Sequence, residues 1–196
     1  QKKKKFSNLD FHKLPNIMGV LNLTPDSFSD GGKFNNKSKG IKHAIEMIKS
    51  GANIIDIGGE STRPGSKAIK KKIEWKRINK IIKFISKKIP TSLDTRKSEI
   101  MEKGIRLGVK IINDVSGLSY DPETKNVLKK YKVPFVIQHS QGIPENMQKN
   151  PKYKNVLLDI YDFFEQKIIS LRSFGIKHNN IILDPGIGFG KNLKHN

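Results

Sequence analysis

The feature that most constrains this chain is the regular alternation of short apolar segments with helical patterns. Short apolar runs bounded by polar or glycine-containing stretches predict strands. Six such runs occur, at residues 17–23, 53–59, 91–95, 109–115, 135–139 and 180–184. Between them apolar residues recur every three or four positions, at 41–48, 75–89, 99–107, 126–131 and 157–171. That spacing predicts amphipathic helices, and strands that alternate with helices predict a parallel sheet.

Two of these helical patterns carry specific expectations. Trp75 begins an apolar stripe that continues to Ile89, and a Trp in such a stripe is expected in the core rather than in a binding site. The last pattern is expected to bury one face, which carries Leu157, Ile160, Phe164, Ile168 and Leu171.

A polar residue lies at or near the carboxyl end of every predicted strand. These residues are Asn22, Asp56, Asp94, Asn113, His139 and Asp184. In an open doubly wound sheet only a few strands feed the ligand crevice, whereas a (β/α)8 barrel brings every strand end to one mouth. The sequence therefore predicts a barrel. A barrel has eight strands, so we expect one domain over residues 1–196 that forms the barrel only to its sixth strand, preceded by a basic tail at 1–5.

Composition excludes several function classes. The chain has no cysteine, which excludes disulfides and thiolate metal sites, and no apolar run approaches the length that spans a membrane. The first residues lack the apolar core of a signal peptide, so a cytoplasmic protein is expected. The net charge of +20 raises the alternative of a nucleic-acid-binding protein. The basic residues are mostly Lys and are spread over the predicted helices. Genomic base bias toward A/T-rich codons explains such a surplus, so no nucleic-acid partner is expected.

The glycine-rich segment after the sixth strand resembles a phosphate loop only superficially. A P-loop needs G-x-x-x-x-G-K-[ST], whereas here Pro185 precedes the first glycine and Asn192 follows Lys191. The glycines instead predict a sharp turn that lets a flat ligand lie close to Asp184. The five histidines show no metal-binding spacing, and His139 is expected to be structural.

Five motifs together resemble the dihydropteroate synthase family. They are M-G-V-L-N-L-T-P-D-S-F-S-D-G-G, I-D-I-G-G-E-S-T-R-P-G, L-D-T with I-N-D-V-S-G-L, H-S-Q-G-x-P-E-N-M-Q, and L-D-P-G-I-G-F-G-K. They occur in the family's order over essentially the whole length. The resemblance implies a pterin-binding barrel that condenses 6-hydroxymethyl-7,8-dihydropterin pyrophosphate with 4-aminobenzoate, giving 7,8-dihydropteroate and pyrophosphate.

The resemblance also implies roles for individual residues. Asp184 would accept the donor edge of the pterin, with Asn113 and Asp94 completing the contacts, and Asp94 would favour positive charge on the pterin methylene. Thr62 and Arg63 would meet the diphosphate and shape the aminobenzoate pocket. Mg²⁺ is the implied cofactor, with Asn22 in its site. The family implies a homodimer, and loops 24–32 and 60–65 are expected to order when substrates bind.

The sequence departs from the family pattern in two ways, and one alternative function stays open. Gln138 and Ser140 replace methionines of the family pattern M-H-M-Q-G, which is expected to remove apolar packing near the pterin. The family's S-R-K and R-x-H segments, expected on strands seven and eight, do not occur. The alternative is a related pterin-binding barrel such as a methyltetrahydrofolate:corrinoid methyltransferase, which shares the Asp/Asn/Asp contacts but is not expected to share the loops after Thr24 and Glu60.

Overall fold

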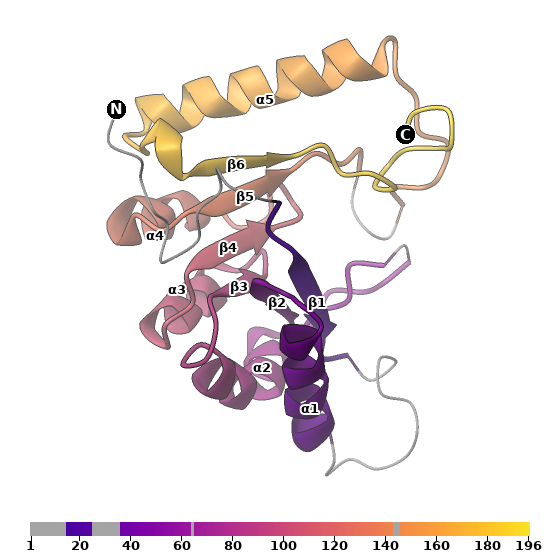
Figure 1. Ribbon diagram of the computed structural model, residues 1–196. Coiled ribbons are helices and arrows are strands. Elements are labelled where there is room, and N and C mark those ends of the chain that lie inside the picture. The colour runs from indigo at the N-terminus through magenta and orange to yellow at the C-terminus, as the bar shows by residue number, and fades with distance from the viewer. Residues whose placement is uncertain (1–14, 25–35, 64, 143–145) are drawn as a thin grey trace.

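A computed structural model describes residues 15–24, 36–63, 65–142 and 146–196 (Figure 1). The predicted basic tail and nearly all of loop 24–32 lie outside these ranges. All six predicted strands are present, each shorter than its sequence pattern by one to three residues. They are β1 (Met18–Asn22), β2 (Ile54–Gly58), β3 (Thr91–Asp94), β4 (Ile111–Asp114), β5 (Phe135–Gln138) and β6 (Ile181–Asp184).

The helices follow the predicted alternation. They are α1 (Asn36–Lys49), α2 (Lys71–Ile85), α3 (Ser98–Arg106), α4 (Thr124–Tyr131) and α5 (Val156–Ser173), with a short 3₁₀ helix, η2 (His178–Asn180), before β6. α1 extends five residues before its apolar pattern begins. α2 ends at Ile85, four residues before Ile89. Pro90 disfavours helical backbone at Ile89 itself, so the helix could not have included the end of the predicted pattern. Ile89 nevertheless packs against the core, as does Trp75.

The strands form one parallel sheet in the order β1-β2-β3-β4-β5-β6. A doubly wound sheet reverses direction at a switch point, whereas a barrel adds each strand beside the one before it. The uninterrupted order therefore confirms the barrel-type prediction, with six strands present. Figure 1 shows the sheet as a curved fan, with α1 to α4 along its outer side and α5 beside β6.

The two faces of the sheet differ in composition. Outward-pointing strand residues such as Leu21, Ile57 and Leu93 pack with helical residues such as Ile82 into the main hydrophobic core. The inner face carries a much smaller apolar cluster, formed by Ile54, Ile111 and Val136 with the partly buried Met18 and Ile182. No helical residue belongs to this inner cluster in the described part of the chain. The helices thus bury the outer face and leave the inner face to polar side chains.

One prediction about α5 is wrong. Leu157 was expected on the buried face, but its side chain is 78% exposed, whereas Phe164 and Leu171 are buried as expected. The side chain of Asn155 caps the helix by accepting hydrogen bonds from the N–H groups of Leu157 and Leu158. Leu157 therefore lies in the first turn, outside the contact with the sheet. None of the helices in the described ranges combines the length and the hydropathy needed to cross a membrane.

Candidate active site

Five of the six predicted polar residues share the inner face near the carboxyl ends of the strands, namely Asn22, Asp56, Asp94, Asn113 and Asp184. The prediction fails for His139, which follows β5 and packs edge-on against the Phe163 ring of α5 at 4.9 Å. The parallel register pairs Asn22 with Gly58, Gly58 with Asp94, and Asp94 with Asn113. Residues at the same register on neighbouring strands point to the same side of a sheet, so these four positions form one row across β1 to β4. Asp184 lies at the end of β6, two residues beyond this row and on the same face.

Gly58 makes room for the polar side chains on either side of it. A Cβ at this position would lie 3.1 Å from Asn22 Oδ1 and 3.3 Å from Asp94 Oδ2. The two side chains therefore converge over the glycine from opposite strands. The absence of a side chain at Gly58 is what lets an amide oxygen and a carboxylate oxygen approach the same point.

Two carboxylates on the inner face, those of Asp94 and Asp56, are buried close to other negative charges. Burial raises the pKa of Asp94 well above its usual value, and the carboxylates of Asp56, Asp114, Glu74 and Glu60 raise it further. Burial also raises the pKa of Asp56, partly opposed by the nearby Ser92 hydroxyl and by a hydrogen bond of 3.0 Å that the Asn113 amide donates to Asp56 Oδ2. The first negative charge in the group therefore disfavours a second, and a cationic ligand would relieve the repulsion.

Asn113 and Asp56 each keep one oxygen unused. Asp56 Oδ1 and Asn113 Oδ1 are buried and have no hydrogen-bond partner among the described residues. Buried polar atoms in folded proteins are usually paired. Asn113 Oδ1 is the stronger candidate to accept a donor from a ligand, because the Ser92 hydroxyl beside Asp56 already partly offsets the rise in the pKa of that carboxylate.

Asp184 is half-buried and is partly occupied by its own loop. Its Oδ1 accepts a hydrogen bond of 2.8 Å from the Gly186 N–H. Gly186, Gly188 and Gly190 all have positive φ angles, which confirms the predicted sharp turn. A side chain at Gly186 would collide with the His139 carbonyl. The close contact between Gly186 and the His139 carbonyl thus packs the loop against the end of β5. The second carboxylate oxygen of Asp184 remains for a ligand.

A buried lysine holds this loop in place. Lys191 Nζ lies 3.0 Å from His139 Nδ1 and donates to the carbonyl oxygens of Gly186 and Phe189, each at 3.1 Å. Burial and the adjacent Lys191 charge lower the pKa of His139 to about 4. The imidazole is therefore neutral near pH 7 and accepts from the ammonium group, in agreement with the predicted structural role.

The loop that carries Thr62 and Arg63 begins directly after β2. Thr62 is half-buried and Arg63 is exposed. The loop is braced internally, since Ser66 Oγ donates to the Ser61 carbonyl at 2.7 Å and the Ser66 N–H donates to the Arg63 carbonyl at 3.0 Å. The loop therefore has defined backbone contacts without a ligand.

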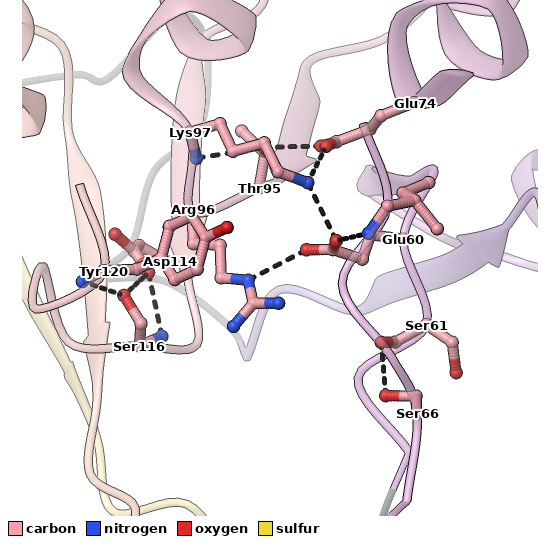
Figure 2. Close-up of polar contacts among 11 residues, drawn as sticks. Glu60, Ser61, Ser66, Glu74, Thr95, Arg96, Lys97, Asp114, Ser116 and Tyr120 are labelled. Atoms are coloured by element: carbon pink, nitrogen blue, oxygen red, sulfur yellow. Dashed lines mark hydrogen bonds and ion pairs between the residues drawn. The ribbon is translucent and has the colours of Figure 1, made fainter. Parts of the chain in front are cut away.

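Figure 2 shows a cluster that the sequence did not predict, at the end of β3. Lys97 Nζ lies 2.8 Å from Glu60 Oε1 and 2.6 Å from Glu74 Oε2. Thr95 Oγ1 donates to the other oxygen of Glu74, and Arg96 Nε donates to the other oxygen of Glu60. A signal was present in the sequence: Glu74 falls on the apolar stripe of α2, where a carboxylate requires a buried partner.

A pocket of about 300 Å³ opens beyond the ends of β4 and β5, and none of Asn22, Asp94, Asn113 and Asp184 lines it. Arg96 lines it and stacks on the Tyr120 ring at 4.0 Å, with further walls formed by Val115, Ser116, Ser119, Gln138, Ser140, Gly142, Met147, Phe163, Lys167 and Phe189. Gln138 and Ser140, the two departures from the family pattern, both line the pocket. Met147 also lines the pocket and places a thioether in its wall.

The described residues offer little for a metal on their own. No group of three or more His, Cys, Asp or Glu side chains in the described ranges is arranged to hold a metal ion. The oxygens of Asn22 and Asp94 that converge over Gly58 are hard donors. Two such donors suit Mg²⁺, which usually retains several waters and takes further oxygens from a phosphate-bearing substrate.

Comparison with known proteins agrees with the geometry. The family model described as pterin binding enzyme matches residues 18–196. The chain is 46% identical over 182 residues to the dihydropteroate synthase of Clostridium beijerinckii, covering 92% of this chain and 65% of that protein. The chain spans about 65% of the length of the curated relatives it matches.

Solved structures show the same fold. A Clostridium difficile dihydropteroate synthase crystallised in the presence of pteroic acid superposes with a TM-score of 0.86 at 43% identity, over 95% of this chain and 70% of that one. The Xanthomonas albilineans enzyme with 4-aminobenzoic acid also gives 0.86, at 34% identity, over 94% of this chain and 66% of that one. With its sequential parallel strands and the polar row on their inner face, the chain belongs to the pterin binding enzyme family.

Proposed function

We propose that this protein acts as a dihydropteroate synthase. The amino group of 4-aminobenzoate would attack the methylene carbon of 6-hydroxymethyl-7,8-dihydropterin pyrophosphate, and the bond from that carbon to the diphosphate oxygen would break. The observation that carries the proposal is the convergence of Asp94, Asn113 and Asp184 on one face of the sheet. The relatives named as dihydropteroate synthases support the same reaction.

Recognition of the pterin would use the atoms that the fold leaves unpaired. The pterin carries adjacent N–H donors along one edge, which suit the second oxygen of Asp184. The Asn113 oxygen, which has no partner in the described part of the chain, would accept a further donor. The pocket beside Gln138, with Phe189 and Val115 in its walls, would contact the flat ring. Pairing buried acceptors with ligand donors removes their desolvation cost.

Asp94 would act on the developing charge. As the bond to the diphosphate breaks, positive charge grows on the methylene and the pterin ring. Burial and nearby carboxylates raise the pKa of Asp94, so a positive charge that develops beside it is stabilised more strongly than beside an exposed carboxylate. The carboxylate would therefore interact more strongly with the transition state than with the ground state, which is the condition for rate acceleration.

The diphosphate would be held on the other side of the row. Thr62 and Arg63 would contact its oxygens and shape the aminobenzoate site. Mg²⁺ at Asn22, with Asp94 as a second oxygen donor, would neutralise charge on the leaving group. Family resemblance also leads us to propose a cytoplasmic homodimer. Sedimentation analysis of the purified protein tests whether it is a dimer.

Asp184→Asn tests the proposal. We use the chain extended by the segment that follows the matched region in the Clostridium beijerinckii relative, referred to below as the extended chain. The amide keeps Oδ1 for the Gly186 N–H but replaces the second acceptor with a donor. Calorimetry with 6-hydroxymethyl-7,8-dihydropterin should show affinity reduced roughly ten- to a hundredfold, which is about 1–3 kcal/mol.

The matched control is Asp162→Asn, an exposed carboxylate on α5. It should bind the pterin as the unmodified extended chain does. An unmodified extended chain that forms no dihydropteroate with Mg²⁺ and both substrates would contradict the proposed function. Unchanged pterin affinity in Asp184→Asn would show that Asp184 has only a structural role.

A further inference from the structure

The three charged side chains of Lys97, Glu60 and Glu74 are almost completely buried. Lys97 is 2% exposed, Glu60 is 6% exposed and Glu74 is 0% exposed. Taking three charges out of water is costly, and hydrophobic residues of similar volume often fill such a space at no loss of stability. A stability role alone therefore gives a weak reason for the cluster, and its connections to the rest of the protein suggest a different one.

Glu60 holds the two ends of one loop together. Its Oε1 accepts the Ile69 N–H at 2.8 Å as well as the Lys97 ammonium. The segment between Glu60 and Ile69 contains Thr62 and Arg63, so the carboxylate closes the loop that carries both residues. Arg77 Nη1 braces the same place by donating to the Gly59 carbonyl at 2.7 Å.

The other half of the cluster lies in the short segment between β3, which ends at Asp94, and α3. Thr95 and Lys97 follow Asp94 in the chain, and Thr95 Oγ1 donates to Glu74 Oε1 at 2.6 Å. Glu74 belongs to α2, which packs its apolar face on the sheet. Lys97 thus connects the closed loop after β2, the end of β3 and the body of the molecule through a single ammonium group, as Figure 2 shows.

Every carboxylate oxygen in the cluster has a partner. Lys97 and the Ile69 N–H share one oxygen of Glu60, and Arg96 takes the other. Lys97 and Thr95 take the two oxygens of Glu74. Two cations also balance two anions. A network that is both neutral and fully paired fixes its members in one arrangement, because any rearrangement leaves a buried charge without a partner.

We propose that Lys97 is a positioning residue that fixes the loop bearing Thr62 and Arg63 against the end of β3. The inference rests on the proposed function, in which this loop meets the diphosphate and 4-aminobenzoate. Lys97 touches no substrate and acts through Glu60. Its loss leaves the inner-face residues that would bind the pterin in place and releases the loop, so it affects one substrate and not the other.

The test compares Lys97→Met with Lys103→Met in the extended chain. Lys103 pairs with Glu99 on the surface of α3, so its replacement removes a charge without disturbing the cluster. In Lys97→Met we expect the KM for 4-aminobenzoate to rise about tenfold or more, since misplacement by about 1 Å can cost about a hundredfold. The Kd for the pterin should stay within about threefold of the unmodified value.

Hydrogen exchange supplies a readout that does not need turnover. The Ile69 N–H should exchange faster in Lys97→Met because Glu60 no longer holds it, while the Ile112 N–H, bonded to the Pro134 carbonyl in the sheet, should keep its protection. If Lys97→Met does not fold, the double variant Lys97→Met/Glu74→Gln removes one cation and one anion together, and the same two readouts apply to it.

The outcomes separate the two proposals. An unmodified extended chain without pterin binding and turnover contradicts the proposed function. An active unmodified chain, together with a folded Lys97 variant that keeps both its KM for 4-aminobenzoate and its Ile69 protection, overturns the positioning role. Loss of protection at Ile69 and Ile112 together also overturns it, because that result shows a general loss of stability.

Discussion

Replacing Gly58 with alanine tests whether the inner-face row works as a unit. The added Cβ would lie 3.1 Å from Asn22 Oδ1 and 3.3 Å from Asp94 Oδ2, where ordinary contact begins at 3.4 Å. Both side chains must therefore withdraw by a few tenths of an ångström. Gly58 has no positive φ angle, so alanine fits the backbone, and it loses less chain entropy on folding than glycine.

The expected effect falls on catalysis and not on stability. If a displacement of 1 Å costs about a hundredfold, a few tenths of an ångström should lower kcat/KM for the dihydropterin substrate by roughly three- to tenfold. The free energy of unfolding should change by less than about 1 kcal/mol, because the entropy gain offsets the tight contacts. The assay is Mg²⁺-dependent dihydropteroate formation in the extended chain, together with urea unfolding.

Gly19→Ala supplies the opposite pattern. Gly19 lies on β1 but faces outward, and a Cβ there would lie 2.8 Å from Met47 Sδ and 3.2 Å from Ile55 Cδ1. Overpacking the core should cost about 1–3 kcal/mol while kcat/KM is kept. Unchanged kcat/KM in Gly58→Ala, or activity that falls in both variants in proportion to their stability, would refute the assignment of Asn22 and Asp94 to one functional row.

Two further predictions concern stability. Burial raises the pKa of Asp114 from 3.8 to about 6, so the wild-type protein should lose up to about 3 kcal/mol relative to Asp114→Asn as pH rises from 4 to 7. Below pH 4 Asp114 is buried in its protonated form, whereas above pH 6 the buried group carries a charge, which is unfavourable. An equal difference in unfolding free energy between the wild type and Asp114→Asn at pH 4 and at pH 7 would contradict the shift. Asn155→Ala should destabilise the protein by about 1 kcal/mol in urea unfolding by removing the α5 cap, and Asn155→Asp should retain the cap.

The sequence predicted the architecture well because the strands and helices repeat a local pattern. Apolar runs locate every strand, and polar residues at their ends indicated the barrel order. Errors arose where local spacing gave no information on contacts. Leu157 continues the apolar stripe of α5, but the stripe extends beyond the part of the helix that meets the sheet. Ile89 likewise continues the pattern of α2, although the helix ends at Ile85 and Pro90 keeps Ile89 out of helical backbone.

The candidate site was predictable in its row of Asn22, Asp94 and Asn113, because residue types and strand register together fix their positions. The ion cluster was missed because Lys97, Glu60 and Glu74 lie far apart in the sequence, and nothing local shows that a lysine is buried. Only Glu74, on the apolar stripe of α2, gave a warning. Long-range pairing of charges follows from tertiary packing, which sequence periodicity does not contain.

The unpaired inner-face oxygens of Asp56 and Asn113 have an evolutionary consequence. A substitution that paired or removed them would make the free protein more stable, so selection for robustness alone would erase them. We expect such atoms to persist where a bound ligand supplies the missing partner. Selection for thermostable variants should therefore favour substitutions at these positions. We expect those variants to lose activity.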